Sequence, residues 1–65
     1  MKISRKKIEV LQAQRGYNHG QLAQASGISR QSLSTIMGRG TCRPDNAGKI
    51  AHALGVDPEE IADDE

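Results

Sequence analysis

Apolar residues recur at helical spacing along most of this 65-residue chain. Ile8 and Leu11 lie three residues apart in the first segment. Ala47, Ile50 and Leu54 follow at positions i, i+3 and i+7 in a later segment. Because a helix has 3.6 residues per turn, each set falls on one helical face. No run shows the strict alternation of a half-buried strand, so the pattern predicts an all-α fold.

Residues that favour helix ends divide the chain into five short helices. Ser, Asn and Asp side chains cap helix starts by accepting a backbone N–H, and glycine ends helices in the left-handed conformation. Asn18 and Gln21 form a variant of the capping box. The five predicted helices run from Ser4 to Arg15 before Gly16, from Asn18 to Gly27, from Ser29 to Met37 before Gly38 and Gly40, from Asp45 to Gly55, and from Asp57 through Pro58, Glu59 and Glu60.

The end of the chain changes from apolar to acidic. We predict that Ile61 docks in the core at the end of the short fifth helix, and that residues 63–65 form a frayed acidic tail. No repeat, linker or low-complexity stretch interrupts the chain. These features predict a single compact domain over residues 1–65.

The second and third predicted helices have the spacing of a helix-turn-helix. The small side chain of Ala23 lets another helix approach closely, and Gly27 permits the positive φ of a tight turn. Three apolar positions at fixed offsets complete the pattern, and they are Ile28, Leu33 and Ile36. The alternative is a helical corner that serves only as core packing.

The outer face of the third helix carries a stripe of uncharged polar residues. At 100° per residue, Gln31, Ser34 and Thr35 point roughly opposite Leu33, with Arg30 on the flank. A purely solvated face would more usually carry Glu and Lys pairs. Glutamine pairs with adenine, arginine pairs with guanine or phosphate, and a threonine methyl contacts the thymine methyl, all in the DNA major groove. The stripe therefore favours base recognition.

Charge is divided between the two parts of the chain. Eight of the nine Lys and Arg residues lie in residues 1–43, where Glu9 is the one acid. Seven of the eight Asp and Glu residues lie in residues 44–65, where Lys49 is the one base. This polarity predicts one surface that attracts polyanions and another that repels them. The alternative is a pair of ordinary solvated faces.

The composition argues against several other classes of protein. No apolar run approaches the roughly 20 residues of a membrane span, and no signal peptide is evident. His19, His52 and Cys42 match no zinc spacing, so we expect no metal site and a free surface thiol at Cys42. No activated nucleophile, paired carboxylate or phosphate-binding glycine loop is present, so we expect neither an enzyme nor a cofactor.

The segment YNHGQLAQASGISRQSLSTI, preceded by IEVL and followed by RPDNAGKIAHALGVDPEEI, resembles the phage-repressor-like helix-turn-helix family of the Cro/cI or XRE type. The likeness covers residues 4 to 62. It implies a compact five-helix lambda-repressor-like domain with the helix-turn-helix at helices 2 and 3. It also implies a cytoplasmic, bacterial or phage-type regulator that binds double-stranded DNA as a homodimer.

The resemblance assigns roles to individual positions. Base-reading positions correspond to Arg30, Gln31, Ser34 and Thr35. Positions that contact the DNA backbone correspond to Asn18, His19, Ser29, Arg39, Thr41 and Arg43. From their charge, we expect phosphates to be neutralised by Lys2, Arg5, Lys6, Lys7, Arg39 and Arg43.

Three departures from the family pattern affect these roles. His19 stands where glutamine is frequent, and its imidazole can replace the amide at a phosphate. Gln12 and Met37 stand where many members pair Arg with Glu. Because both partners are replaced together, no charge is left without its partner. Asp45 stands where some relatives have a base, which shortens the phosphate footprint.

The sequence therefore predicts a sequence-specific DNA-binding transcriptional regulator, acting as a repressor, with its third helix in the major groove. We expect the dimer contact in the acidic C-terminal third, at Val56, Pro58 and Ile61. One alternative is an antitoxin or antirepressor-type module that binds a protein on the same scaffold. RNA binding is disfavoured because Tyr17 is the one aromatic residue. No small-molecule ligand is evident.

Overall fold

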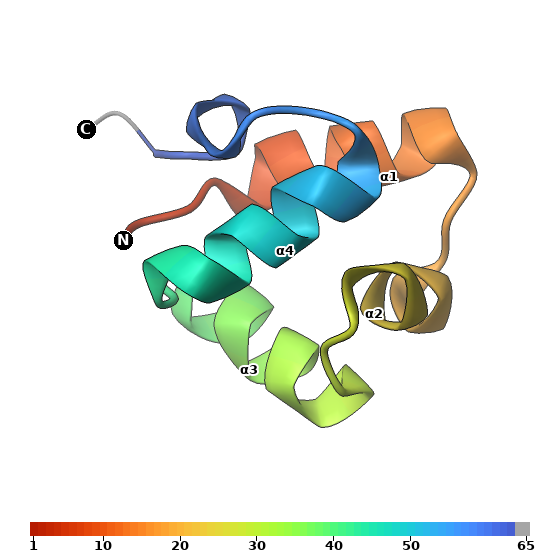
Figure 1. Cartoon of the computed structure of the whole chain (residues 1–65), viewed down its shortest axis with the longest axis horizontal. Coiled ribbons are helices and arrows are strands. Elements are labelled where there is room, and N and C mark those ends of the chain that lie inside the picture. The colour runs from red at the N-terminus through yellow and green to blue at the C-terminus, as the bar shows by residue number, and fades with distance from the viewer. Residues whose placement is uncertain (64–65) are drawn as a thin grey trace.

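The computed structural model describes residues 1–63 as four α-helices followed by one 3-10 turn. The elements are α1 (Arg5–Arg15), α2 (His19–Ser26), α3 (Arg30–Arg39), α4 (Pro44–Leu54) and η1 (Pro58–Glu60). In Figure 1, α1 and η1 lie above the central α4, α3 lies below it, and α2 lies beside it. None of these described helices is long and apolar enough to span a bilayer.

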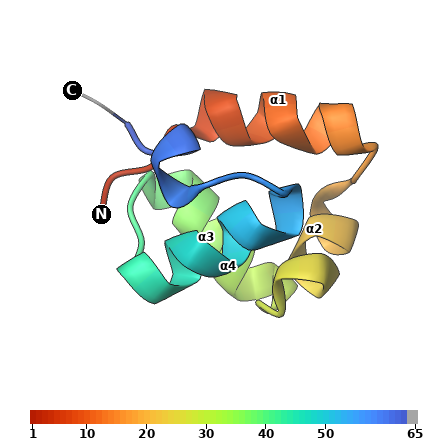
Figure 2. The same cartoon turned by 45° about the horizontal axis from the view of Figure 1, so that its top comes forward.

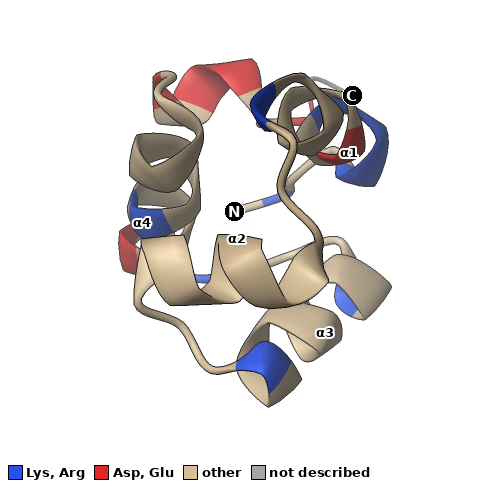
Figure 3. Ribbon diagram, turned by 90° about the vertical axis from the view of Figure 1, so that its right-hand side faces the viewer, with Lys and Arg blue, Asp and Glu red and all other residues tan. Residues whose placement is uncertain are grey.

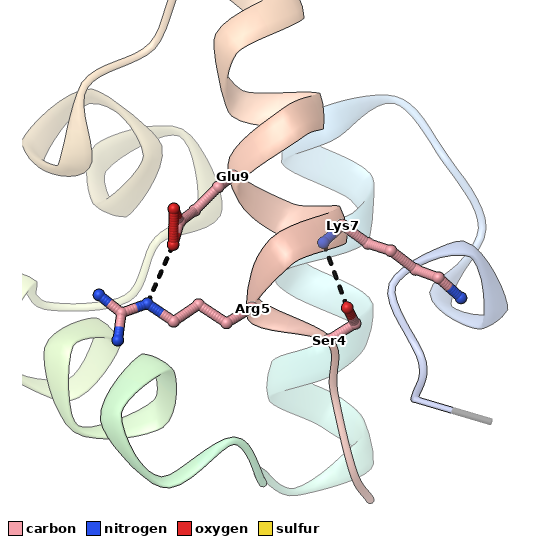
Figure 4. Close-up of polar contacts among 4 residues, drawn as sticks. All are labelled: Ser4, Arg5, Lys7 and Glu9. Carbon is pink, nitrogen blue, oxygen red and sulfur yellow. Dashed lines mark hydrogen bonds and ion pairs between the residues drawn. The ribbon is translucent and has the colours of Figure 1, made fainter. Parts of the chain in front are cut away.

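The caps predicted at Asn18 and Ser29 are confirmed, and Ser4, the predicted start of the first helix, is a cap as well. The side chains of Ser4, Asn18 and Ser29 accept the backbone N–H three residues on, at 3.2, 2.8 and 3.1 Å. Figure 4 shows the first of these bonds, from Lys7 to Ser4. The Gln21 side chain also accepts the Asn18 N–H at 2.8 Å, which completes the predicted capping box. These bonds satisfy N–H groups that helix starts leave open.

The prediction of five helices was wrong at the C-terminal end. Residues 58–60 form a single 3-10 turn, because Ile61 turns into the core directly after it. Asp57 does precede this turn as predicted, and its N–H donates to the Glu60 carboxylate at 3.0 Å.

Two predicted boundaries also differ. Helix α3 continues through Gly38 to Arg39, and Gly40, with φ of 72°, supplies the left-handed end. Helix α4 begins at Pro44 instead of being capped by Asp45. Proline suits the first helical position because it lacks the N–H that would be unsatisfied there. Asp45 then lies in the first turn, where its charge complements the helix dipole.

One apolar core joins all four helices. Its fully buried large side chains are Ile8, Leu22, Leu33, Ile50, Leu54 and Ile61, all of which the apolar pattern predicts to face inward. Ala23 is 2% exposed, and α2 packs against both α3 and α4, in keeping with the close approach predicted for a small residue. Leu11 is half-buried against this core.

The two ends of the described chain lie together, which the sequence pattern did not predict. Ile3 is buried, and its N–H donates to the Gly40 carbonyl at 2.9 Å. The Ser4 N–H donates to Ile61 at 2.7 Å, and the Asp63 N–H donates to the Lys2 carbonyl at 3.1 Å. In Figure 2 the N-terminal segment runs beside the C-terminal one. Asp63 is thus bonded instead of frayed, whereas residues 64 and 65 of the predicted tail lie outside the described residues.

A cation from α1 caps the C-terminal end of α4. The Arg15 Nε donates to the Leu54 carbonyl at 3.1 Å. Gly55 follows with φ of 73°, and a Cβ at this position would overlap the Arg15 guanidinium. Glycine therefore provides both the left-handed turn and the space for the arginine.

We expect Arg15→Ala to lower the free energy of unfolding by about 1 kcal/mol, because it leaves a terminal carbonyl without its cationic partner. Urea denaturation followed by circular dichroism measures the change. Arg5→Ala is the control, since Arg5 forms an exposed ion pair with Glu9 and such pairs contribute less than about 1 kcal/mol. Equal losses for the two variants would contradict the cap.

Candidate nucleic-acid interface

Helices α2 and α3 form the predicted helix-turn-helix. Gly27 ends α2 with φ of 74°, and the Ile28 N–H bonds back to the Ala23 carbonyl at 3.1 Å. Ile28, Leu33 and the small Ala23 are buried, which fixes the two helices against each other. The turn and its sealing residues therefore hold α3 as one rigid unit with α2.

The outward face of α3 carries the four predicted base-reading residues. Arg30, Gln31, Ser34 and Thr35 are all exposed, as the helical rotation from Leu33 predicts. The Thr35 hydroxyl donates to the Gln31 carbonyl at 3.1 Å, so its proton is used within the helix. Gln31 is exposed, and its amide makes no hydrogen bond among the described residues, so both its donor and its acceptor are available to a base edge.

His19 joins the start of α2 to α3. Its Nε2 lies 2.9 Å from the Ser34 Oγ and 3.3 Å from the Arg30 carbonyl oxygen. The imidazole nitrogen thereby lies within hydrogen-bond distance of two residues of α3 that are one turn apart. The Ser34 hydroxyl is engaged in this link, so its proposed contact with a base would have to share or replace the bond to His19.

The residues before α2 and α3 place polar groups at the same edge. Asn18 uses its carbonyl oxygen in the capping box, which leaves its amide donors available. The Ser29 Oγ accepts the Ser32 N–H and lies 2.9 Å from the Ser32 hydroxyl. Both caps are exposed and stand at the starts of the two helices of the motif.

The segment after α3 carries three further predicted contacts. Arg39, Thr41 and Arg43 are exposed, with Arg39 in the last turn of α3. Arg43 Nε lies 3.7 Å from Asp45, in a pair whose side chains are 84% and 63% exposed. The shortened phosphate footprint expected from Asp45 stays a prediction, and this exposed pair is the contact that a phosphate at Arg43 would have to replace.

The basic N-terminal residues are less available than their number implies. Arg5 pairs with Glu9 at 3.0 Å, as Figure 4 shows. Lys7 donates to the Ala62 carbonyl at 3.2 Å, and Lys2 has a partner of its own. Lys6 lines an apolar hollow beside Val10. The predicted neutralisation of phosphates by this segment stays a prediction and competes with these contacts.

The charges are less separated in space than in sequence, because Lys6 and Lys7 of α1 line the same hollow as Glu60. In Figure 3 the acidic segment around η1 lies at the opposite end of the molecule from α3, and α2 carries no charged residue. The charges on α3 are those of Arg30 and Arg39. A polyanion is therefore attracted to the α3 end, whereas the acidic residues of η1 are partly offset by Lys6 and Lys7 beside them.

Gln12 and Met37, both uncharged, occupy the positions where many family members pair Arg with Glu. Both line the same hollow between α1 and α3, and Met37 packs partly buried against the core. Arg5 and Glu9 line this hollow as well, so an apolar contact in place of the charged pair stays a prediction. Neither Gln12 nor Met37 carries a charge that needs a partner.

Two residues near the motif were missed by sequence reasoning. Asn46, in the first turn of α4, lines a hollow with Gln31 and Thr35. Gly20, in the first turn of α2, lies under the Arg30 side chain. Both contacts join different helices, so no local spacing could indicate them.

Cys42 is half-buried against the core instead of being a surface thiol as predicted. Burial raises the pKa of this thiol above its ordinary value; the nearby amino terminus opposes the rise and Asp45 adds to it. Because the thiolate is the nucleophile, burial makes this cysteine less reactive. Within residues 1–63, no three His, Cys, Asp or Glu side chains gather to hold a metal ion.

We expect Cys42 to react with iodoacetamide more slowly in the folded protein than in urea. Its rate should keep rising with pH beyond the ordinary thiol range. Since the folded state retains the proton more firmly, the thiol's contribution to stability is constant below the ordinary thiol pKa and falls as pH rises through the folded value. Equal alkylation rates in the folded and unfolded states would contradict this assignment.

The motif and its surface define a helix-turn-helix DNA-binding domain. The sequence model of the Cro/C1-type HTH DNA-binding domain family matches residues 7–65. The chain belongs to this family, and the resemblance predicted from its sequence is confirmed. Comparisons with curated proteins and with solved structures give no match.

Proposed function

We propose that this protein is a sequence-specific transcriptional regulator that acts as a repressor, with residues 1–65 as a single domain and α3 in the major groove. The observation that carries the proposal is the exposed, uncharged polar stripe of α3, held by His19 and by the buried contacts of α2. In such a motif the second helix lies in the groove and the first crosses the DNA backbone. The setting is the cytoplasm of a bacterial or phage-type system.

The proposed contacts fall into two groups, those that read bases and those that position the protein on the DNA backbone. Gln31 and Thr35 are the proposed base readers on the stripe, together with Ser34 when it leaves His19. Contacts to the DNA backbone are proposed for Asn18, His19, Ser29, Arg39, Thr41 and Arg43. Such contacts fix the register of a protein on DNA and carry no sequence information directly.

Selection from random duplex DNA at moderate salt tests this proposal. The protein is expected to enrich one half-site motif, and a paired motif would report the spacing of a homodimer, about one helical turn for this class. Enrichment of no sequence by a folded protein would overturn the proposal.

A homodimer on DNA is part of the proposal, but its predicted contact needs revision. Ile61 is fully buried and cannot reach a partner, so its assignment to the dimer surface was wrong. Pro58 is exposed and Val56 is half-buried, so these two residues stay candidates. Sedimentation of the protein with and without the enriched duplex gives the oligomeric state.

A protein-interaction module is the second candidate. The observation that favours it is an apolar hollow between α1 and η1 that Val10, Leu11, Lys6 and Glu60 help to line. Val10 is 49% exposed, and both elements lie on the side of α4 away from α3 (Figure 1). Failure of DNA selection together with stable capture of a partner protein would favour this function.

A further inference from the structure

The side chain of Arg30 lies against the first turn of α2. A Cβ built at Gly20 would lie 3.3 Å from both Cζ and Nε of Arg30 and 3.6 Å from its Nη2. Such an approach is tighter than most Cβ contacts in proteins, so a Cβ at position 20 would shift the guanidinium by a few tenths of an ångström. The missing side chain at Gly20 therefore lets the Arg30 guanidinium lie close against α2.

Arg30 lies on the α2 side of the outward face of α3, whereas Gln31 and Thr35 lie on its α4 side. Arg30 lines a hollow with Asn18, Gly20 and Ser29, on the side of α2. Gln31 and Thr35 line another hollow, on the side of α4. When the second helix of such a motif occupies the major groove, the first helix crosses the DNA backbone. The position beside α2 therefore directs Arg30 toward phosphate.

The electrostatic setting of Arg30 fits an anion. The ion pairs described in residues 1–63 join Arg5 to Glu9 and Arg43 to Asp45, and neither involves Arg30. No acidic residue lines the hollow that contains Arg30 and Gly20. A guanidinium keeps its charge at any physiological pH, so it meets a phosphate with its full charge.

We propose, on the basis of the function proposed above, that Gly20 is a positioning residue that turns Arg30 to a backbone phosphate and away from the base edges. Arg30 then contributes affinity without sequence preference, and specificity rests on the stripe that contains Gln31. This assignment replaces the base-reading role that the family resemblance gives to Arg30.

Two substitutions at Arg30 test the type of contact. Binding is measured on the enriched duplex and on a scrambled duplex of equal length, over a range of salt. R30A is expected to weaken binding to both duplexes by a similar factor, to lower the salt slope of log K by about 1, and to leave the selected motif unchanged. R30K restores the charge without the planar fork that reads guanine, so it is expected to recover most of the affinity and the slope.

Substitutions at glycine test the positioning. G20A is expected to weaken binding to both duplexes when Arg30 is present and to have no effect in the R30A background. G48A is the matched control, because Gly48 also lies inside a helix and a Cβ there meets nothing within 4 Å. Both alanines favour the helix, so melting curves should show each variant folded and no less stable than the parent.

Other outcomes of these experiments would distinguish failure of this inference from failure of the proposed function. Relaxed preference at one base position in R30A, with unchanged binding to the scrambled duplex, would make Arg30 a base reader and overturn the inference while leaving the proposed function intact. An effect of G20A that is the same with and without Arg30 would remove the positioning role. Absence of any enriched duplex for the parent protein would overturn the proposed function and this inference together.

Discussion

Replacing Ile61 with alanine is expected to lower the free energy of unfolding by about 2–5 kcal/mol. The side chain is fully buried and belongs to the core that joins the four helices. Its backbone carbonyl also accepts the Ser4 N–H at 2.7 Å, so a shift of Ile61 disturbs the start of α1. A domain of this size has a total stability of only about 3–10 kcal/mol, so a large share of the variant is expected to be unfolded.

Urea denaturation followed by far-ultraviolet circular dichroism measures this loss. Glu59→Ala is the control two residues away, because Glu59 is exposed and its loss should change the stability by less than about 0.5 kcal/mol. A loss below about 1 kcal/mol for the Ile61 variant would mean that the C-terminal segment does not hold the core.

Gln31→Ala is expected to weaken binding to the enriched duplex by about 1–3 kcal/mol and to relax the preference at one base position. Gln31 is exposed, follows Arg30 in the first turn of α3 and carries an amide that can pair with adenine through two bonds. The amide of Gln31 is not engaged in a hydrogen bond among the described residues. The Thr35 hydroxyl, in contrast, already donates its proton to the Gln31 carbonyl.

Selection repeated with this variant, together with titration of the enriched and scrambled duplexes, reports the change. Gln14→Ala removes the same amide from an exposed position on α1 and serves as the control. An equal loss on the two duplexes for the Gln31 variant would show that this residue contributes to affinity and does not read a base.

Local signals account for the parts of the fold that were predicted. Ser4, Asn18 and Ser29 cap helices through a backbone N–H only three residues away, so the amino-acid types at that spacing are enough to predict the bonds. Pro44 and Asp45 are two competing start signals in adjacent positions, and the structure shows that proline begins the helix. The residue types alone do not determine which of these two signals begins the helix.

Contacts between distant residues could not be predicted in the same way. The Arg15 bond to the Leu54 carbonyl spans 39 positions, and the burial of Ile3 depends on the chain returning to it at residue 61. At the candidate site, helical rotation predicts that Gln31 and Thr35 face outward. It says nothing of the His19 contact with Ser34, because this contact depends on the angle between two helices.

The pairing of the chain ends has a consequence for the order of folding. The bond between Ser4 and Ile61 closes a loop of almost the whole chain, and such closure costs more entropy than the short loops between α2, α3 and α4. We therefore expect the ends to join last and to open first. Because the Ile3 N–H also holds the Gly40 carbonyl, each opening frees the loop that follows α3. Amide hydrogen exchange should accordingly be faster at Ile3 and Ser4 than in the buried turns of α2 and α4.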